Sequence, residues 1–225
     1  MEKTFFKLLY LTGASRPLGS FSFSGGLEAF ISRGFARDRE SLSAHLKLLL
    51  EKVWAGTEIP LFRRCFLAAL KADSLELLRW NEVSSALRES HEFYLEEREP
   101  GRALMSLLRE QVALPAWMEE LSPQLGFLAA LGAGAVLFGA KRRDLSRLSG
   151  LLMWSALENR VTAAAKLVPL GRGDSQGLLL ELMPVIPGLS RRAERVGDEE
   201  IGLSLPLRGI LSALHETDSL RMFRS

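Results

Sequence analysis

The sequence predicts an all-α protein, because apolar residues recur every three or four positions from Arg39 onward, the period of an amphipathic helix. Apolar and polar residues alternate only from Phe21 to Ser24, which is too short for a convincing strand. Neither a strand–helix–strand rhythm nor a repeat of about 20–50 residues is present. We expect residues 1–225 to form a single compact domain of about eight to ten helices, with a flexible N-terminal arm (1–25) and C-terminal tail (216–225).

Three helices are predicted before Pro100. Ser41 can cap the first of them. Its apolar face consists of Leu42, Leu46, Leu49 and Val53. A threonine, an acid and a proline within residues 57–60 are typical of the start of the second helix. Asp73 or Ser74 caps the third.

Proline and glycine interrupt the helical pattern at Pro100 and Gly101, and it resumes at Leu104. Pro115 begins a short helix. Ser122 followed by proline is typical of an N-cap and first helical position, which predicts another helix there. The glycines that follow indicate close contacts between helices. They are Gly126, Gly132, Gly134 and Gly139.

The last third of the chain predicts three more helices. Asp144 caps a long one, which ends near Leu167 before a proline and a glycine. The next starts at Asp174 and ends near two prolines. A final helix runs from about Leu205 to Leu214.

The composition is that of an ordinary globular protein, with 47% hydrophobic residues and a formal net charge of +2. Such a chain is neither disordered nor collagen-like, and so small a charge surplus gives no reason to expect nucleic acid as a partner. The longest uncharged apolar run, residues 125–140, falls short of the ~20 residues that cross a bilayer. The apolar run at the N-terminus is broken by Lys7. We therefore expect a cytoplasmic protein without a membrane span.

The residues that usually carry catalysis or bind metals are sparse. Cys65 is the only cysteine, and the three histidines lie far apart in the sequence, so we expect no tightly bound metal or cofactor. Phosphate-binding loops and nucleophile elbows are missing, which favours a protein that is not an enzyme. An enzyme would have to use His91 with Glu92 or Glu89. The acidic run at 96–99 predicts a solvated helix face.

Four separated segments carry a recognisable family pattern. They are Pro17–Glu28, Arg88–Arg102, Trp154–Gly171 and His215–Ser225. In this order, and spanning nearly the whole chain, they resemble the UreF family of urease accessory proteins. Three residues depart from the family pattern. They are Ser20, where glycine is usual, Phe23, where tyrosine is usual, and Pro100.

The resemblance implies an all-α homodimer that acts as an adaptor and not as an enzyme. Proteins of this family join UreD, also called UreH, and the GTPase UreG for the insertion of nickel into apo-urease. The resemblance also implies an influence on GTP use by UreG, with nickel handled by the assembled complex. The alternative is a helical interaction module of a different complex.

Nine residues within these segments are candidate partner-binding residues. They are Phe21, Ser22, Phe23, Glu28, Lys166, Arg221, Met222, Phe223 and Arg224. The phenylalanines near the N-terminus lie among serines and glycines, where exposed rings are unfavourable without a partner. In the C-terminal tail, arginines flank methionine and phenylalanine, a composition typical of interface hot spots. The resemblance implies that Glu28 and Lys166 face the GTPase. The alternatives are that Glu28 only favours the positive end of its helix, and that Lys166 lies along apolar surface or interacts with the C-terminal end of its helix.

Overall fold

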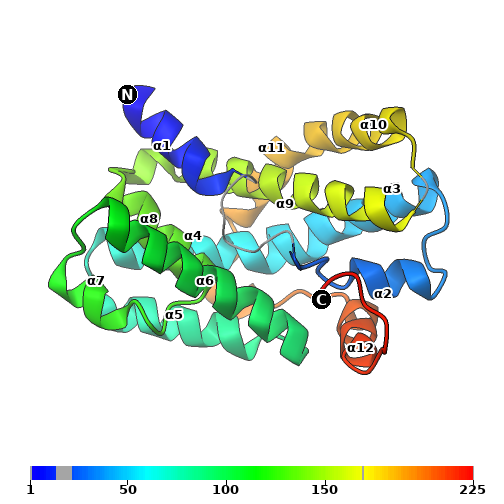
Figure 1. The fold of residues 1–225 in the computed structure, drawn as a ribbon. Coiled ribbons are helices and arrows are strands. Elements are labelled where there is room, and N and C mark those ends of the chain that lie inside the picture. Colours follow the sequence, from blue (N-terminus) through cyan, green and yellow to red (C-terminus); the bar gives the residue numbers. More distant parts are fainter. Residues whose placement is uncertain (1, 14–21, 169, 225) are drawn as a thin grey trace.

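The computed structural model describes residues 2–13, 22–168 and 170–224, and within these ranges it contains helices and no strand (Figure 1). Ten α-helices have eight residues or more: α1 (Glu2–Thr12), α3 (Arg39–Leu48), α4 (Ile59–Leu70), α5 (Ser74–Ala86), α6 (His91–Gln111), α8 (Phe127–Leu137), α9 (Leu145–Leu167), α10 (Arg172–Leu182), α11 (Ile186–Ala193) and α12 (Pro206–His215). Shorter elements are α2 (Leu27–Ser32), α7 (Ala116–Leu121) and 3₁₀ turns at Arg142–Asp144, Met183–Val185 and Asp198–Glu200. A π-helix spans Leu49–Glu58. The predicted all-α class is confirmed.

One continuous helical rod extends from α3 through the π-helix into α4. It begins at Asp38, whose carboxylate accepts the N–H of Ser41 at 2.9 Å, so Ser41 belongs to the cap without being the capping residue. The helix start predicted at 57–60 coincides with the first residue of α4, Ile59, but the chain before it is already helical, so no break separates the two helices. Pro60 lies in the first turn of α4, where the wider π-turns give way to α-turns and a missing N–H is tolerated. The start signals therefore mark a change of helix type.

Helix α6 passes through Pro100 without a break, so the predicted interruption there is wrong. A proline inside a helix costs about 3 kcal/mol, and tertiary packing must offset this cost. Pro100 is buried, and the next residue, Gly101, touches the segment that leads into α8. A Cβ atom at Gly101 would lie 2.5 Å from the carbonyl carbon of Gly126. Close packing against this segment thus keeps the helix continuous where the local sequence predicts an end.

Helix α8 is the central helix of the core and packs against α4 and α6. It is apolar on all sides, as expected for a helix with no solvent-facing stripe. Gly132 allows the backbone of α4 to approach, since a Cβ atom there would lie 2.8 Å from the amide nitrogen of Phe66. Close contact at this glycine is as predicted. The predicted start at Ser122 is wrong, because Ser122 ends α7 and α8 begins at Phe127.

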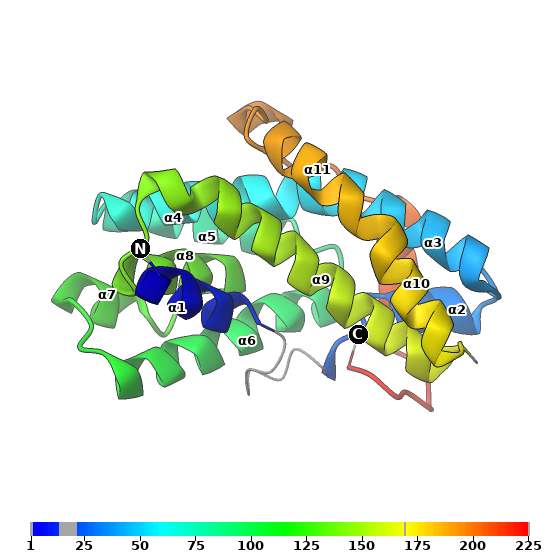
Figure 2. The same ribbon diagram turned by 90° about the horizontal axis from the view of Figure 1, so that it is seen from above.

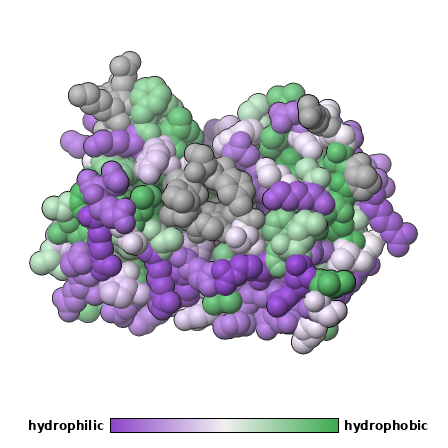
Figure 3. Space-filling model, in the orientation of Figure 1, coloured by the Kyte–Doolittle hydropathy of each residue, from purple (hydrophilic) through white to green (hydrophobic). Residues whose placement is uncertain are grey.

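Helix α9 covers one face of this core and contacts α1, α10 and α11 (Figure 2). Helices α2 and α12 and the C-terminal end gather at one end of the molecule (Figure 1). Figure 3 shows hydrophilic side chains over much of one face and apolar side chains over α1, where Phe6 is 64% exposed. Among the described helices, none combines the length and apolar character needed to span a bilayer.

Candidate partner-binding site

Two glycines turn the chain into α2 and place Glu28 in its first turn. Gly25 and Gly26 have φ angles of 66° and 82°, a region that residues with a Cβ atom rarely adopt. The hydroxyl of Ser24 accepts the N–H of Glu28 at 3.0 Å and fixes the start of the helix. Glu28 is 8% exposed. This low exposure means that another segment of the polypeptide covers the Glu28 side chain.

That polypeptide is the C-terminal tail. The two oxygens of the Glu28 carboxylate accept the N–H groups of Met222 and Phe223, each at 2.7 Å. The N–H of Arg224 donates to the carbonyl of Ser22 at 2.7 Å. Hydrogen bonds to an ionised carboxylate are about twice as strong as those between neutral groups. The tail, which the sequence suggests is weakly anchored, is held here by three backbone N–H groups.

Aromatic and cationic side chains complete this contact. The rings of Phe23 and Phe223 are 3% and 6% exposed. The guanidinium of Arg224 lies 5.3 Å from the ring centre of Phe23, and the ammonium of Lys166 lies 5.5 Å from that of Phe223. Six of the nine predicted residues therefore lie together, and we call them the tail cluster. It consists of Ser22, Phe23, Glu28, Lys166, Phe223 and Arg224.

Two of the other three predicted residues, Arg221 and Met222, lie at the edge of the tail cluster. The Arg221 guanidinium lies 3.3 Å from a carboxylate oxygen of Glu92 on α6. The side chain of Met222 is 61% exposed, so it points outward while its N–H reaches Glu28. Phe21 lies outside the described residues. The tail thus buries one apolar side chain, Phe223, and presents another, Met222, to solvent.

A buried histidine that the sequence analysis left without a role supports the tail cluster from below. His215, at the end of α12, is 1% exposed. Its Nδ1 lies 2.8 Å from Glu92, and its Nε2 lies 3.4 Å from Glu28. Both carboxylates also contact the tail, through Arg221 and through the N–H groups of Met222 and Phe223. His215 thus connects α12, α6 and α2 beneath the tail.

A groove of about 530 Å³ lies between the start of α6 and the tail. It is lined by His91, Glu92, Leu95, Glu216 and residues 221–224. The His91 ring stacks with that of Tyr94, their centres 6.2 Å apart. The Glu92 carboxylate instead contacts His215, Ser212 and Arg221. The hypothetical catalytic pair of His91 and Glu92 therefore has little geometric support.

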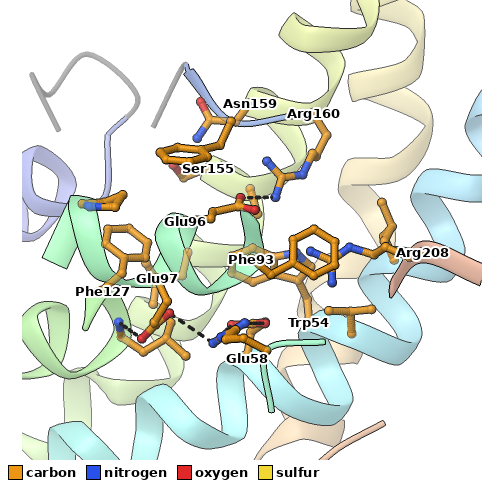
Figure 4. Close-up of a pocket in the computed structure, with 18 residues that line it drawn as sticks. Trp54, Glu58, Phe93, Glu96, Glu97, Phe127, Ser155, Asn159, Arg160 and Arg208 are labelled. Atoms are coloured by element: carbon orange, nitrogen blue, oxygen red, sulfur yellow. Dashed lines mark hydrogen bonds and ion pairs between the residues drawn. The ribbon is translucent and has the colours of Figure 1, made fainter. Parts of the chain in front are cut away.

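Behind the tail cluster lies a polar pocket that the sequence analysis missed (Figure 4). The acidic run at 96–99 was predicted to be a solvated face, which is wrong for Glu97, because that residue is 4% exposed. Arg88 donates to Glu58 at 2.5 Å and to Glu97 at 3.1 Å. Burial raises the pKa of Glu97, while the charge of Arg88 lowers it. Phe23 belongs to the tail cluster and also lines this pocket, so the two regions adjoin.

No group of three or more histidine, cysteine or acidic side chains with the geometry of a metal site occurs in the described parts of the chain. Cys65 is fully buried, and burial raises the pKa of its thiol. A buried neutral thiol is a poor metal ligand, because metals bind the thiolate. The tail cluster and its edge instead present exposed cations, Lys166 and Arg224, and the exposed Met222, beside the groove.

Comparison with known proteins identifies the family. The model of the UreF family matches residues 36–183. The chain is 36% identical to a urease accessory protein UreF of Pseudomonas putida over 222 residues, which cover 97% of this chain and 96% of that protein. It is 34% identical to a UreF of Marinomonas over 97% of this chain and 93% of that protein. For a UreF of Alcanivorax borkumensis the identity is 31%, with 100% and 99% covered. The chain therefore belongs to the UreF family of urease accessory proteins.

Proposed function

We propose that this protein is an adaptor in urease maturation and performs no bond chemistry of its own. It links UreD (UreH) to the GTPase UreG, influences GTP hydrolysis by UreG, and so assists the insertion of nickel into apo-urease. Nickel is the cargo of the assembled complex, and no cofactor is bound tightly by this chain. The adaptor works in the cytoplasm as a homodimer.

The observation that carries this proposal is the tail cluster. Segments near residues 22–28, 166 and 221–224 resemble UreF at the sequence level, and the fold brings them to one surface. Lys166 and Arg224 are exposed cations there, beside the exposed Met222. Such a mixture of apolar and guanidinium groups is typical of protein interfaces. The cluster and the adjoining groove therefore support docking of a partner with acidic edges.

The proposal is tested by capture of UreG on the preformed complex of this protein with UreD. Met222→Ala removes an apolar side chain that is 61% exposed, so it should weaken capture without altering the fold. Leu75→Ala is the matched control, because Leu75 on α5 is 80% exposed and distant from the cluster. Equal capture by both variants and the wild type would show that the exposed Met222 beside the tail cluster does not contact the partner.

A deletion strain tests the biological role separately. Loss of the protein should leave urease subunits made and assembled, yet poor in nickel and inactive. The measurements are urease activity and the nickel content of the purified enzyme. Active, nickel-replete urease in that strain would favour the alternative, a helical interaction module of another complex.

A further inference from the structure

The polar pocket behind the tail cluster has a mixed lining. Its volume is about 80 Å³. Aromatic rings of Phe23, Phe93 and Phe127 form part of the wall, and the π-helix contributes Trp54 and Glu58 (Figure 4). A water molecule needs about 10–15 Å³ of such space, so the pocket has room for several waters or one small polyatomic ion. π-Helices frequently occur at functional sites, which makes this wall a reasonable place to look for a ligand.

The arginine side chains that line the pocket differ in whether a nearby carboxylate balances their positive charge. Arg88 is bound to both Glu58 and Glu97, and Arg160 is bound to Glu96 at 2.7 Å. Arg208 differs, because no carboxylate of the described residues lies within ion-pair distance of it. Its Nε donates to the carbonyl of Gly25 at 3.0 Å, and its guanidinium stacks on the ring of Phe93 at 3.7 Å. The positive charge of Arg208 is thus stabilised by the dipole of the Gly25 carbonyl and by the Phe93 ring.

Burial is the main cause of the pKa shifts around the pocket, and neighbouring arginines add to the shifts of Arg208 and His45. Burial lowers the pKa of Arg208 to about 10, and Arg160 and Arg88 contribute to this although carboxylates oppose it. Burial and the charges of Arg208 and Arg160 lower the pKa of His45, on the adjacent α3, to about 4. Burial also raises the pKa of Glu97 and so favours its neutral form. The contributions of neighbouring arginines to the shifts of Arg208 and His45 indicate that an added negative charge beside these arginines would be stabilised, whereas the shift of Glu97 reflects its burial.

Two polar atoms of the lining also lack partners. Nε of Arg88 and Oδ1 of Asn159 are buried, and neither has a hydrogen-bond partner in the described parts of the chain. Buried polar atoms are nearly always paired with protein, water or ligand. The two unpartnered atoms differ in kind, because Nε of Arg88 is a hydrogen-bond donor and Oδ1 of Asn159 is a hydrogen-bond acceptor. An occupant with oxygen atoms, and with a hydroxyl to donate, could satisfy both kinds of group.

We propose that this pocket binds one small oxyanion, with the guanidinium of Arg208 as its principal anchor and Asn159 as a second contact. A cation is disfavoured, because Glu58, Glu96 and Glu97 are each bound to arginine. Phosphate and hydrogen carbonate carry an O–H that can donate to Asn159, whereas sulfate does not at neutral pH. The inference is independent of the adaptor role, since it concerns occupancy of a pocket in the isolated chain.

The test is isothermal titration of the full chain with sodium phosphate, hydrogen carbonate, sulfate and acetate, each against sodium chloride at equal ionic strength. We expect saturable binding of at least one oxyanion at one site per chain, accompanied by a higher melting temperature. Arg208→Gln should weaken that binding at least about tenfold, the effect of losing one charged hydrogen bond. Arg195→Gln, at an exposed arginine, is the matched control and should bind as the wild type does.

With the wild type and Arg208→Gln, three results would overturn the proposal. They are no saturable binding beyond that of chloride, equal binding by Arg208→Gln and the wild type, and saturable binding of nickel chloride in place of an anion. Asn159→Ala provides a second variant if Arg208→Gln fails to fold. This substitution should weaken the binding of phosphate and hydrogen carbonate more than the binding of sulfate. Unchanged affinities for all three anions would also contradict the proposed site.

Discussion

Substitution of Gly101 by alanine should destabilise the protein through a clash that no side chain can relieve. A Cβ atom at Gly101 would lie 2.5 Å from the carbonyl carbon of Gly126, 2.6 Å from the oxygen of Leu125 and 2.7 Å from the nitrogen of Phe127. Favourable carbon contacts lie near 3.5–4.0 Å, so the backbones must separate by about 1 Å. The Gly126 N–H, which donates to Asn81 at 2.7 Å, would move with them.

The size of the effect follows from two opposing contributions. Overpacking in a well-packed core costs about 1–3 kcal/mol and occasionally more, and here the obstructing atoms are all backbone. Alanine regains about 1 kcal/mol of helix propensity over glycine. We expect a net loss of about 2 kcal/mol, which lowers the melting temperature of a chain this long by about 4–8 °C.

Gly150→Ala supplies the matched control. Gly150 also lies inside a long helix, α9, but a Cβ atom there would have nothing within 4 Å. Without a clash, only the propensity gain remains, so this variant should melt about 1–4 °C above the wild type. Both are measured by circular dichroism melting at one protein concentration. If Gly101→Ala melts at or above the wild type, the close approach of α6 to the start of α8 is not as described.

Three further predictions concern single side chains. Burial and the charges of Arg208 and Arg160 lower the pKa of His45 from 6.5 to about 4, so the stability from keeping it neutral is complete above 6.5 and is lost as the pH falls towards 4. Thermal melting between pH 7 and 4.5 should reveal that the free energy of unfolding falls by up to about 3 kcal/mol, and that the fall is smaller in His45→Phe. Cys65, whose thiol pKa is raised by burial, should react with a thiol reagent only after unfolding, and rapid labelling of the native protein would contradict this. Lys166→Ala should lower melting stability by at most about 1 kcal/mol while reducing capture of UreG, whereas a sharp loss of stability with normal capture would make the lysine structural.

Where the local sequence carries the physical cause, the fold could be predicted. Asp73 caps α5, as its side-chain oxygen accepts the N–H of Glu76 at 3.0 Å. The long helix after Asp144 ends at Leu167 as expected, before the predicted breakers. The candidate residues of the partner-binding site were found through family-like segments, since nothing local joins residue 28 to residue 223. That juxtaposition depends on how α2, α9 and α12 pack.

The remaining features arise from contacts between distant segments. The helix through Pro100 persists because Gly101 is packed against the segment before α8, which no local pattern reveals. Glu97 belongs to an acidic run that looks solvated, yet its partner Arg88 comes from the preceding turn and holds it in the interior. An arginine and a glutamate that form a buried ion pair cannot be told from an exposed pair by the sequence around them. The polar pocket was therefore out of reach for sequence reasoning.

The bond between Glu28 and the N–H of Phe223 joins residues 195 positions apart, and this separation has a consequence for biosynthesis. At translation rates of about 5–20 residues per second, the glutamate leaves the ribosome roughly 10–40 s before its partner does. The surface formed by the tail cluster cannot exist until residues 223 and 224 have left the ribosome. Premature termination anywhere before residue 223 therefore removes this surface even where the helical core has folded, and a protein that recognised it would bind only chains that extend through the tail cluster.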